Sequence, residues 1–102
     1  MQAAELAQRI TSNSAPWVID ARSELEFERG HIPNAVHAPF LKIFLKRARL
    51  PENKNSELVI HCEHGPRAMM AKALLNLYGY RNTTLLKGHM LGWRRANLPL
   101  EK

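Results

Sequence analysis

The chain has 102 residues, of which 45% are hydrophobic and 24% are charged. This length allows one domain with a buried core and excludes two, so we expect a single domain over residues 1–102. Fifteen Lys and Arg against nine Asp and Glu give a formal net charge of +6, which favours anionic partners. Because the basic residues are scattered and lack interleaved aromatic side chains, we expect no nucleic-acid partner.

The N-terminus and the cysteine count predict the cellular location. Residues 1–5 have neither the basic nor the apolar region of a signal peptide, and no stretch approaches the roughly 20 apolar residues of a membrane span. The single cysteine excludes a disulfide within the chain. We therefore expect a reducing, cytoplasmic location and no membrane partner.

Helix and strand signals alternate along the chain. Leu6 and Ile10 give the first helix an apolar stripe, because they lie four residues apart. Ser23 and Glu26 form a capping box that starts the second helix, and Gly79 stands where a C′ glycine ends a later one. In chain order, the sequence predicts a helix over 3–10, a strand over 17–19, a helix over 23–30, a strand over 35–37, a helix over 40–50, a strand over 58–61, a helix over 68–78, a strand over 83–86 and a helix over 91–95.

This alternation predicts an α/β fold. Strands separated by helices imply right-handed crossovers and a parallel sheet. Ligands of such sheets bind at the carboxyl ends of the strands, where Asp20 and Cys62 fall. The segment 40–49 mixes apolar and basic side chains; we interpret it as a solvated amphipathic face, with docking on an acidic partner or a membrane surface as the alternative.

The most informative segment is the loop that follows the strand over 58–61. It holds Cys62 five residues before Arg67, in a C-x-x-x-x-R pattern that opens a helix. A strand-to-helix loop gathers unpaired backbone N–H groups, and the helix dipole adds positive charge, so the loop stabilises an anion such as a thiolate. Arg67 adds a positive charge, and Gly65 allows an unusual backbone conformation close to a ligand. Cys62 is therefore predicted to be a nucleophile.

A metal site is the competing interpretation of this loop. His61, Cys62, Glu63 and His64 all carry side chains that can bind metal ions. Adjacent residues of a strand point to opposite faces, so His61 and Cys62 are poorly placed to share one ion, and no second cluster has metal-ligand spacing. We expect no metal and no other cofactor.

Three sets of segments resemble the sequence blocks of the rhodanese family, in the family's order and spacing. They are 18–22 with 26–35, the loop 62–67, and 86–88 with Trp93 and 97–99. The resemblance covers nearly the whole chain and implies a parallel sheet of four or five strands, flanked by helices on both faces. The family usually has a strand before its first helix, whereas this chain begins almost in that helix, which favours four.

The resemblance also implies a cysteine that carries a transferable sulfur as a persulfide. The expected activity is that of a thiosulfate sulfurtransferase, with thiosulfate or another persulfide as donor and a thiol or cyanide as acceptor. A sulfur-relay protein is a further expected partner. The expected site residues are Cys62 as the nucleophile, Glu63, His64, Gly65, Pro66 and Arg67 in the substrate-binding loop, and Asp20 and Arg22 as structural support.

Several residues depart from the family's pattern. His89 stands where a second glycine commonly follows Gly88, and Asn97 stands where a glycine commonly precedes Leu-Pro, although Asn can adopt a positive φ. Pro66 removes one N–H from the loop. Glu63 places a carboxylate beside the cysteine, so we expect dianionic thiosulfate to be a mediocre donor.

Two alternative functions remain open at this point. A cysteine-based phosphatase or arsenate reductase uses a similar loop, but such loops resemble C-x-x-x-x-x-R, one residue longer than the loop found here. A non-catalytic interaction module or a sulfur-relay partner would have the same sequence features. The loop length argues against the first alternative, and the presence of both Cys62 and Arg67 argues against an inactive domain.

Overall fold

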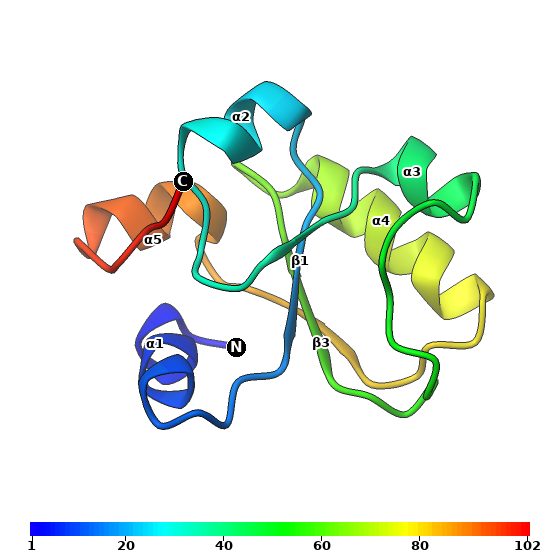
Figure 1. Ribbon diagram of the computed structural model, residues 1–102, viewed down its shortest axis with the longest axis horizontal. Coiled ribbons are helices and arrows are strands. Elements are labelled where there is room, and N and C mark those ends of the chain that lie inside the picture. Colours follow the sequence, from blue (N-terminus) through cyan, green and yellow to red (C-terminus); the bar gives the residue numbers. More distant parts are fainter.

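The structure is a computed structural model that describes residues 1–102, and helices and strands alternate along it (Figure 1). None of its helices is long and apolar enough to cross a membrane. In chain order, the elements are α1 (Ala3–Thr11), β1 (Trp17–Asp20), α2 (Glu24–Arg29), β2 (Val36–His37), α3 (Phe40–Phe44), β3 (Leu58–His61), α4 (Pro66–Leu77), β4 (Thr83–Leu85) and α5 (His89–Arg95).

The four strands form one parallel sheet in the order β2-β1-β3-β4. Asp20 pairs in register with His37 on one side and with His61 on the other, so β1, β2 and β3 end at the same edge of the sheet. Cys62 follows His61 directly and therefore lies at this edge, as predicted from the sequence. The predicted α/β class and the parallel sheet are confirmed, with four strands.

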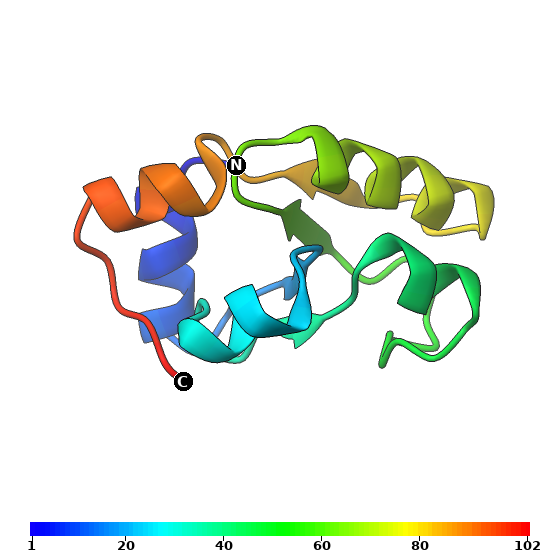
Figure 2. The ribbon, with the colours of Figure 1, turned by 90° about the horizontal axis from the view of Figure 1, so that it is seen from above.

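Helices cover both faces of the sheet (Figure 2). Ile19 and Ile60 pack in one core cluster with residues of α3 and α4, whereas Val18 and Val59 pack in a second cluster with residues of α1 and α5. Adjacent residues of a strand thus serve opposite layers, which explains why the first three residues of both β1 and β3 are apolar. Trp93 of α5 is the largest fully buried side chain, and its indole N–H donates to the Pro99 carbonyl at 2.9 Å.

The capping box at the start of α2 is present as predicted, with Ser23 and Glu26 each bonded to the other's backbone N–H. Asn97 has a φ of 59°, the left-handed conformation that the sequence analysis allowed for it. Two helices begin two residues earlier than predicted: α4 starts at Pro66, a favourable first position for proline, and α5 starts at His89.

A helix begins at Phe40 as predicted, but its predicted end at residue 50 is wrong, because α3 ends at Phe44. Lys46 adopts a left-handed φ of 57°, its N–H donates to the Ile43 carbonyl at 2.9 Å, and the N–H of Arg47 donates to the Lys42 carbonyl at 2.9 Å. These two bonds form a Schellman motif, which closes a helix from its C-terminal side. Glycine usually occupies the left-handed position, so a lysine there gave no signal in the sequence.

Candidate active site

Cys62 lies in the loop between β3 and α4 and is only 1% exposed. The backbone N–H of Gly65 donates a hydrogen bond to its Sγ atom at 3.0 Å, and the N–H of Met90 donates to its carbonyl at 2.9 Å. An N–H aimed at the sulfur favours a negative charge there. The loop therefore holds the sulfur in a fixed position beside the start of a helix, where an anion is stabilised.

Gly65 is required by the geometry of this loop. Its φ is +136°, a conformation that residues with a side chain rarely adopt. A Cβ atom added to Gly65 would lie 3.2 Å from the Nε2 atom of His89, a tight contact with a partly buried ring. Substitution would therefore both strain the backbone and move the N–H that contacts the sulfur.

Arg67 is engaged in an ion pair. Its Nη1 donates to Oε1 of Glu26 at 2.6 Å and its Nη2 donates to Oε2 at 3.1 Å. Arg67 lowers the pKa of Glu26 to about 2, with help from Ser23 and against the opposing effect of burial. Glu26 in turn raises the pKa of Arg67, and the nearby Cys62 sulfur adds to this rise. The positive charge expected beside the sulfur is thus shared with a carboxylate.

A hollow of about 350 Å³ opens over the reactive loop. Its walls come from the loop, from the start of α4 and from α2, and they consist of Glu26, Cys62, Glu63, His64, Pro66 and Arg67. The structure thus brings the predicted loop residues together, with Gly65 behind them, and adds Glu26. Two carboxylates beside one guanidinium leave no excess positive charge in these walls.

Glu63 is paired as well. Arg94 of α5 donates to both of its carboxylate oxygens, and the Nη1 atom of Arg22 lies 3.8 Å from Oε1. Only 18% of the Glu63 side chain is exposed. The sequence predicts a free charge at Glu63, whereas in the structure Glu63 connects the reactive loop to α5 and to Arg22 after β1.

Asp20 and Arg22 form a buried ion pair at the end of β1. Arg22 donates from Nε and Nη2 to the Asp20 carboxylate at 2.8 to 3.1 Å, and Nη2 also donates to the Gly30 carbonyl at 2.9 Å. The pair connects β1 to the C-terminal end of α2, the helix that carries Glu26. Apart from the 3.8 Å approach of Arg22 to Glu63, these contacts are with the scaffold around the reactive loop.

His61 is fully buried next to this pair. Its Nε2 atom lies 3.8 Å from Oδ2 of Asp20 and has no hydrogen-bond partner. Burial lowers the pKa of His61, although the Asp20 charge opposes this effect, so the ring is neutral near neutral pH. His64, by contrast, is exposed at the rim of the hollow.

His89 is a site residue to which the sequence analysis gave no role. The backbone N–H of Cys62 donates to its Nδ1 atom at 3.2 Å, so the neutral ring carries its proton on Nε2. Its φ of 52° is left-handed, as suits a position where the family commonly has glycine. Burial lowers the pKa of His89, and the charge of His64 adds a smaller decrease. In the sequence, the sign of this role is that His89 stands where the family commonly has a glycine.

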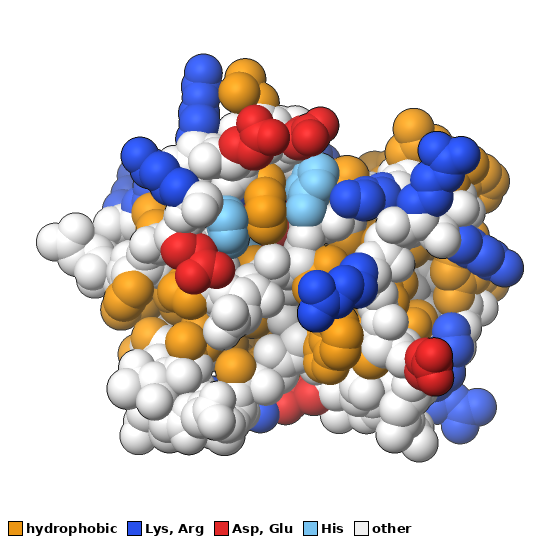
Figure 3. Space-filling view, viewed as in Figure 1, with side chains coloured by type: hydrophobic (Ala, Val, Ile, Leu, Met, Phe, Trp, Pro, Cys, Tyr) orange, Lys and Arg blue, Asp and Glu red, His pale blue; other side chains and the backbone are white.

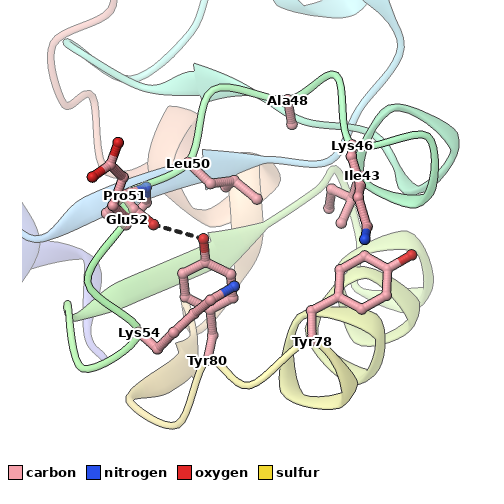
Figure 4. Close-up of a pocket in the computed structure, with 9 residues that line it drawn as sticks. All are labelled: Ile43, Lys46, Ala48, Leu50, Pro51, Glu52, Lys54, Tyr78 and Tyr80. Atoms are coloured by element: carbon pink, nitrogen blue, oxygen red, sulfur yellow. Dashed lines mark hydrogen bonds between the residues drawn. The ribbon is translucent and has the colours of Figure 1, made fainter.

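Other features of the chain lie away from Cys62. No group of three or more His, Cys, Asp or Glu side chains is placed to hold a metal ion. A hollow of about 460 Å³ lies between the C-terminal end of α4 and the chain that leads into β3 (Figure 4). In it, the Tyr80 hydroxyl donates to the Pro51 carbonyl at 2.6 Å, and the Lys54 ammonium lies 4.1 Å from the centroid of the Tyr80 ring. The reactive loop contributes no wall to this hollow.

Comparison with known proteins identifies relatives along almost the whole chain. The sequence model of the rhodanese-like domain family matches residues 2–96. The chain is 32% identical over 95 residues to a sulfurtransferase of Allochromatium vinosum, a match that spans 93% of the chain and 87% of that protein. Other curated relatives are longer, and the chain spans 45 to 52% of the length of four of them.

Solved structures of similar fold include a sulfurtransferase. A human single-domain sulfurtransferase superposes with a TM-score of 0.78 at 25% identity, covering 93% of this chain and 94% of that one. The Alr3790 protein of Anabaena sp. shares the fold with a TM-score of 0.88 at 22% identity, covering 99% of this chain and 81% of that one. The chain therefore belongs to the rhodanese-like domain family, which has sulfurtransferases among its members.

Proposed function

We propose that the chain is a sulfurtransferase that moves a sulfane sulfur from thiosulfate or another persulfide donor to a thiophilic acceptor. The observation that carries the proposal is the N–H of Gly65, which lies 3.0 Å from the sulfur of buried Cys62 in a six-residue loop that opens α4. The name of the A. vinosum relative supports the same reaction class.

The reaction proceeds in two half-reactions through a persulfide on Cys62. First, the Cys62 thiolate attacks the outer sulfur of the donor; an S–S bond forms to Cys62 while the donor's own bond to that sulfur breaks, and the donor leaves as sulfite or as a thiolate. Second, the acceptor attacks the outer sulfur of the persulfide and releases the Cys62 thiolate. No oxidant or reductant is consumed, so the proposed reaction needs neither a metal nor a cofactor.

The residues around Cys62 take separate roles in this scheme. The N–H of Gly65 stabilises the charged sulfur, and Arg67 provides the positive charge nearest to an incoming donor, moderated by Glu26. Glu63 and His64 form the rim against which donor and acceptor approach. The proposed activity resides in one domain over residues 1–102 and suits a reducing, cytoplasmic location.

Mass spectrometry of the intact protein tests the proposal. After incubation with thiosulfate, the chain gains the mass of one sulfur atom, and cyanide removes it as thiocyanate. The Cys62→Ser variant is the matched control, because Cys62 is the only cysteine. Thiocyanate production by Cys62→Ser at the rate of the parent chain would overturn the mechanism.

A further inference from the structure

We propose that the segment 40–49, called the α3 segment below, is a docking surface for an acidic protein that delivers sulfur to Cys62 or receives it. The inference rests on the proposed function and adds the class of partner to it. Three features of the structure carry the inference: exposed apolar side chains, cations without partners, and a groove that leads to the reactive loop.

The α3 segment exposes most of its large apolar side chains. Phe40, Leu41, Phe44 and Leu45 are between 38 and 64% exposed, and the rings of Phe40 and Phe44 are stacked with centroids 6.4 Å apart. Only Ile43 of this helix is buried. Exposed apolar side chains that are contiguous in this way mark interaction surfaces, because they gain stability when a partner removes them from water.

A groove of about 330 Å³ connects these side chains to the reactive loop. Phe40, Leu41 and the exposed Met70 of α4 line it, and so does Arg67. Arg67 also lines the hollow over Cys62, so the two hollows meet at this side chain. A chain lying in the groove would therefore end beside the sulfur. A concave groove accepts a protein side chain, whereas a lipid surface is entered by protruding apolar residues.

The cations of the α3 segment have no acidic partners. Lys42, Lys46, Arg47 and Arg49 take part in none of the ion pairs of the structure. The Lys46 ammonium lies 5.6 Å from the centroid of the Tyr78 ring (Figure 4). The other three line a hollow of about 560 Å³ beside β2, with no acidic residue in its walls. Figure 3 shows Lys and Arg side chains gathered beside apolar surface over this part of the molecule.

These cations select the charge of the partner. Around Cys62 itself, Arg67 and Arg94 are already paired with carboxylates, so the reactive loop offers little free positive charge. Four unpaired cations lie on the α3 segment, where they attract a negatively charged protein and orient it before contact. The partner's persulfide then reaches Cys62 along the groove; the Cys62–sulfur bond forms, the partner's S–S bond breaks, and the partner leaves as a thiolate.

Sulfur transfer from matched synthetic donors tests the inference. The donors are a short peptide of Glu, Leu and Phe that ends in a cysteine persulfide, the same peptide with Lys in place of Glu, and the small persulfide of 2-mercaptoethanol, which has no acidic or apolar side chains. We expect the acidic peptide to load Cys62 at least about tenfold faster than the basic one at low salt. Salt should reduce this preference, because it screens the exposed cations.

Paired variants locate the effect on the α3 segment. Arg47→Glu/Arg49→Glu should slow loading from the acidic peptide by about tenfold and leave loading from 2-mercaptoethanol persulfide unchanged. Arg81→Glu/Arg95→Glu is the control, since both residues are exposed, lack ion pairs and give the same change in net charge. An equal loss in both double variants, or no preference between the peptides, overturns the inference.

Leu41 and Leu77 provide a second matched pair, because both are exposed leucines and only Leu41 lines the groove. Leu41→Asn should slow loading from the acidic peptide several-fold, whereas Leu77→Asn should not. Equal effects of the two substitutions contradict the groove. Binding to vesicles of phosphatidylcholine and phosphatidylserine that requires Arg47 and Arg49, without a preference for the acidic peptide, would assign the surface to a membrane and overturn the proposal.

Binding without chemistry separates this inference from the proposed function. Acidic and basic peptides that carry serine in place of cysteine are titrated into the 15N-labelled chain. Shifts of α3-segment amides with the acidic peptide alone support docking even when no donor loads Cys62, an outcome that rejects the sulfur-transfer mechanism only. Loading of Cys62 by 2-mercaptoethanol persulfide without any peptide binding rejects docking and leaves the sulfur-transfer mechanism intact.

Discussion

The backbone N–H of Cys62 donates a hydrogen bond to the Nδ1 atom of His89 at 3.2 Å, and this bond joins the reactive loop to the start of α5. The same ring lies against Gly65, whose N–H contacts the sulfur. His89 thus touches both ends of the short turn that holds the Cys62 sulfur. It acts as a positioning residue, because its contacts are with the loop backbone.

Two substitutions of His89 distinguish the effect of its hydrogen bond on activity from the effect of its backbone conformation. His89→Gly relieves the left-handed φ but removes the acceptor, so we expect kcat/KM for sulfur transfer to fall about tenfold, equivalent to about 1.4 kcal/mol. His89→Asn keeps an acceptor and tolerates the left-handed conformation, so it should retain most of the activity. Steady-state kinetics of both variants measure the difference, and equal losses would show that the bond does not matter.

The same bond predicts that the rate of sulfur loading falls at acidic pH. Protonation of His89 converts Nδ1 from acceptor to donor and breaks the contact with the Cys62 N–H. Because burial lowers the pKa of His89 below its ordinary value of 6.5, we expect sulfur loading to fall only below pH 6.5. Single-turnover rates of sulfur loading, measured between pH 7.5 and pH 5, should show this decrease in the parent chain but not in His89→Asn. The charge of His64 also lowers the pKa of His89, so His64→Gln should move this decrease in activity to slightly higher pH.

A fully buried histidine, His61, and a partly buried one, His89, also make stability depend on pH. Burial lowers the pKa of both His61 and His89 from 6.5, so the unfolded chain takes up protons that the folded chain resists. Their contribution to stability is complete above pH 6.5 and is lost as the pH falls through the lower, folded-state values. Urea unfolding at several pH values should show that the free energy of unfolding decreases as the pH falls from 7.5 to 5. His61→Leu should flatten that slope, and an unchanged slope would contradict the assignment.

Loop length predicts the absence of phosphatase activity. Six residues from Cys62 to Arg67, with Gly65 contributing the N–H on the sulfur, make a small cradle for one sulfur atom. We expect negligible hydrolysis of p-nitrophenyl phosphate by the chain. Insertion of one glycine between Gly65 and Pro66 should reduce sulfur transfer and introduce some phosphate hydrolysis. Robust hydrolysis by the unmodified chain that disappears in Cys62→Ser would favour the phosphatase alternative.

The fold was predictable wherever local signals decide the structure. The strand over 58–61 has the predicted limits, because an apolar run between polar residues is sufficient to define it. The capping box of Ser23 and Glu26 was predictable for the same reason. The end of α3 was not, because Lys46 closes a Schellman motif without the usual glycine and apolar periodicity continues past it.

The site was predictable only in its local part. The sequence places Cys62, Gly65 and Arg67 in one loop, and the structure keeps them there. The partner of Arg67 is Glu26, 41 residues away, and the partner of Glu63 is Arg94, 31 residues away. These pairs depend on how α2 and α5 pack beside the loop, which periodicity and turn signals do not specify.

The pair of Arg67 and Glu26 predicts which substitution improves thiosulfate as a donor. Glu26→Gln keeps an oxygen for the Ser23 cap but removes the charge that offsets Arg67, so kcat/KM for thiosulfate should rise several-fold at low salt. Glu24→Gln is the matched control, because Glu24 is exposed in the same helix and makes no ion pair. Equal gains in both variants would indicate a general effect of net charge.

The surroundings of Glu63 change the experiment that best tests its charge. From the sequence alone, reversal of the charge by Glu63→Lys is the obvious test. In the structure, however, a lysine at this position would face the Arg94 and Arg22 guanidiniums, and Arg22 is buried with Asp20. We therefore expect Glu63→Lys to lower the free energy of unfolding, which obscures any kinetic gain. Glu63→Gln is the cleaner variant, because it frees the Arg94 guanidinium without adding a cation, while Arg22 stays paired with Asp20.

Glu63→Gln should raise kcat/KM for thiosulfate by about tenfold at low salt, about 1.4 kcal/mol of transition-state stabilisation, because the carboxylate no longer repels the dianion and the freed Arg94 attracts it. The gain should shrink at high salt. In the Arg94→Gln background it should be smaller, since Arg22 stays paired with Asp20 and no cation is then freed. Loading from 2-mercaptoethanol persulfide should change less, because this donor carries at most one negative charge. An unchanged or lower kcat/KM for thiosulfate at low salt would mean that Glu63 acts by holding the loop to α5 rather than by repelling the donor.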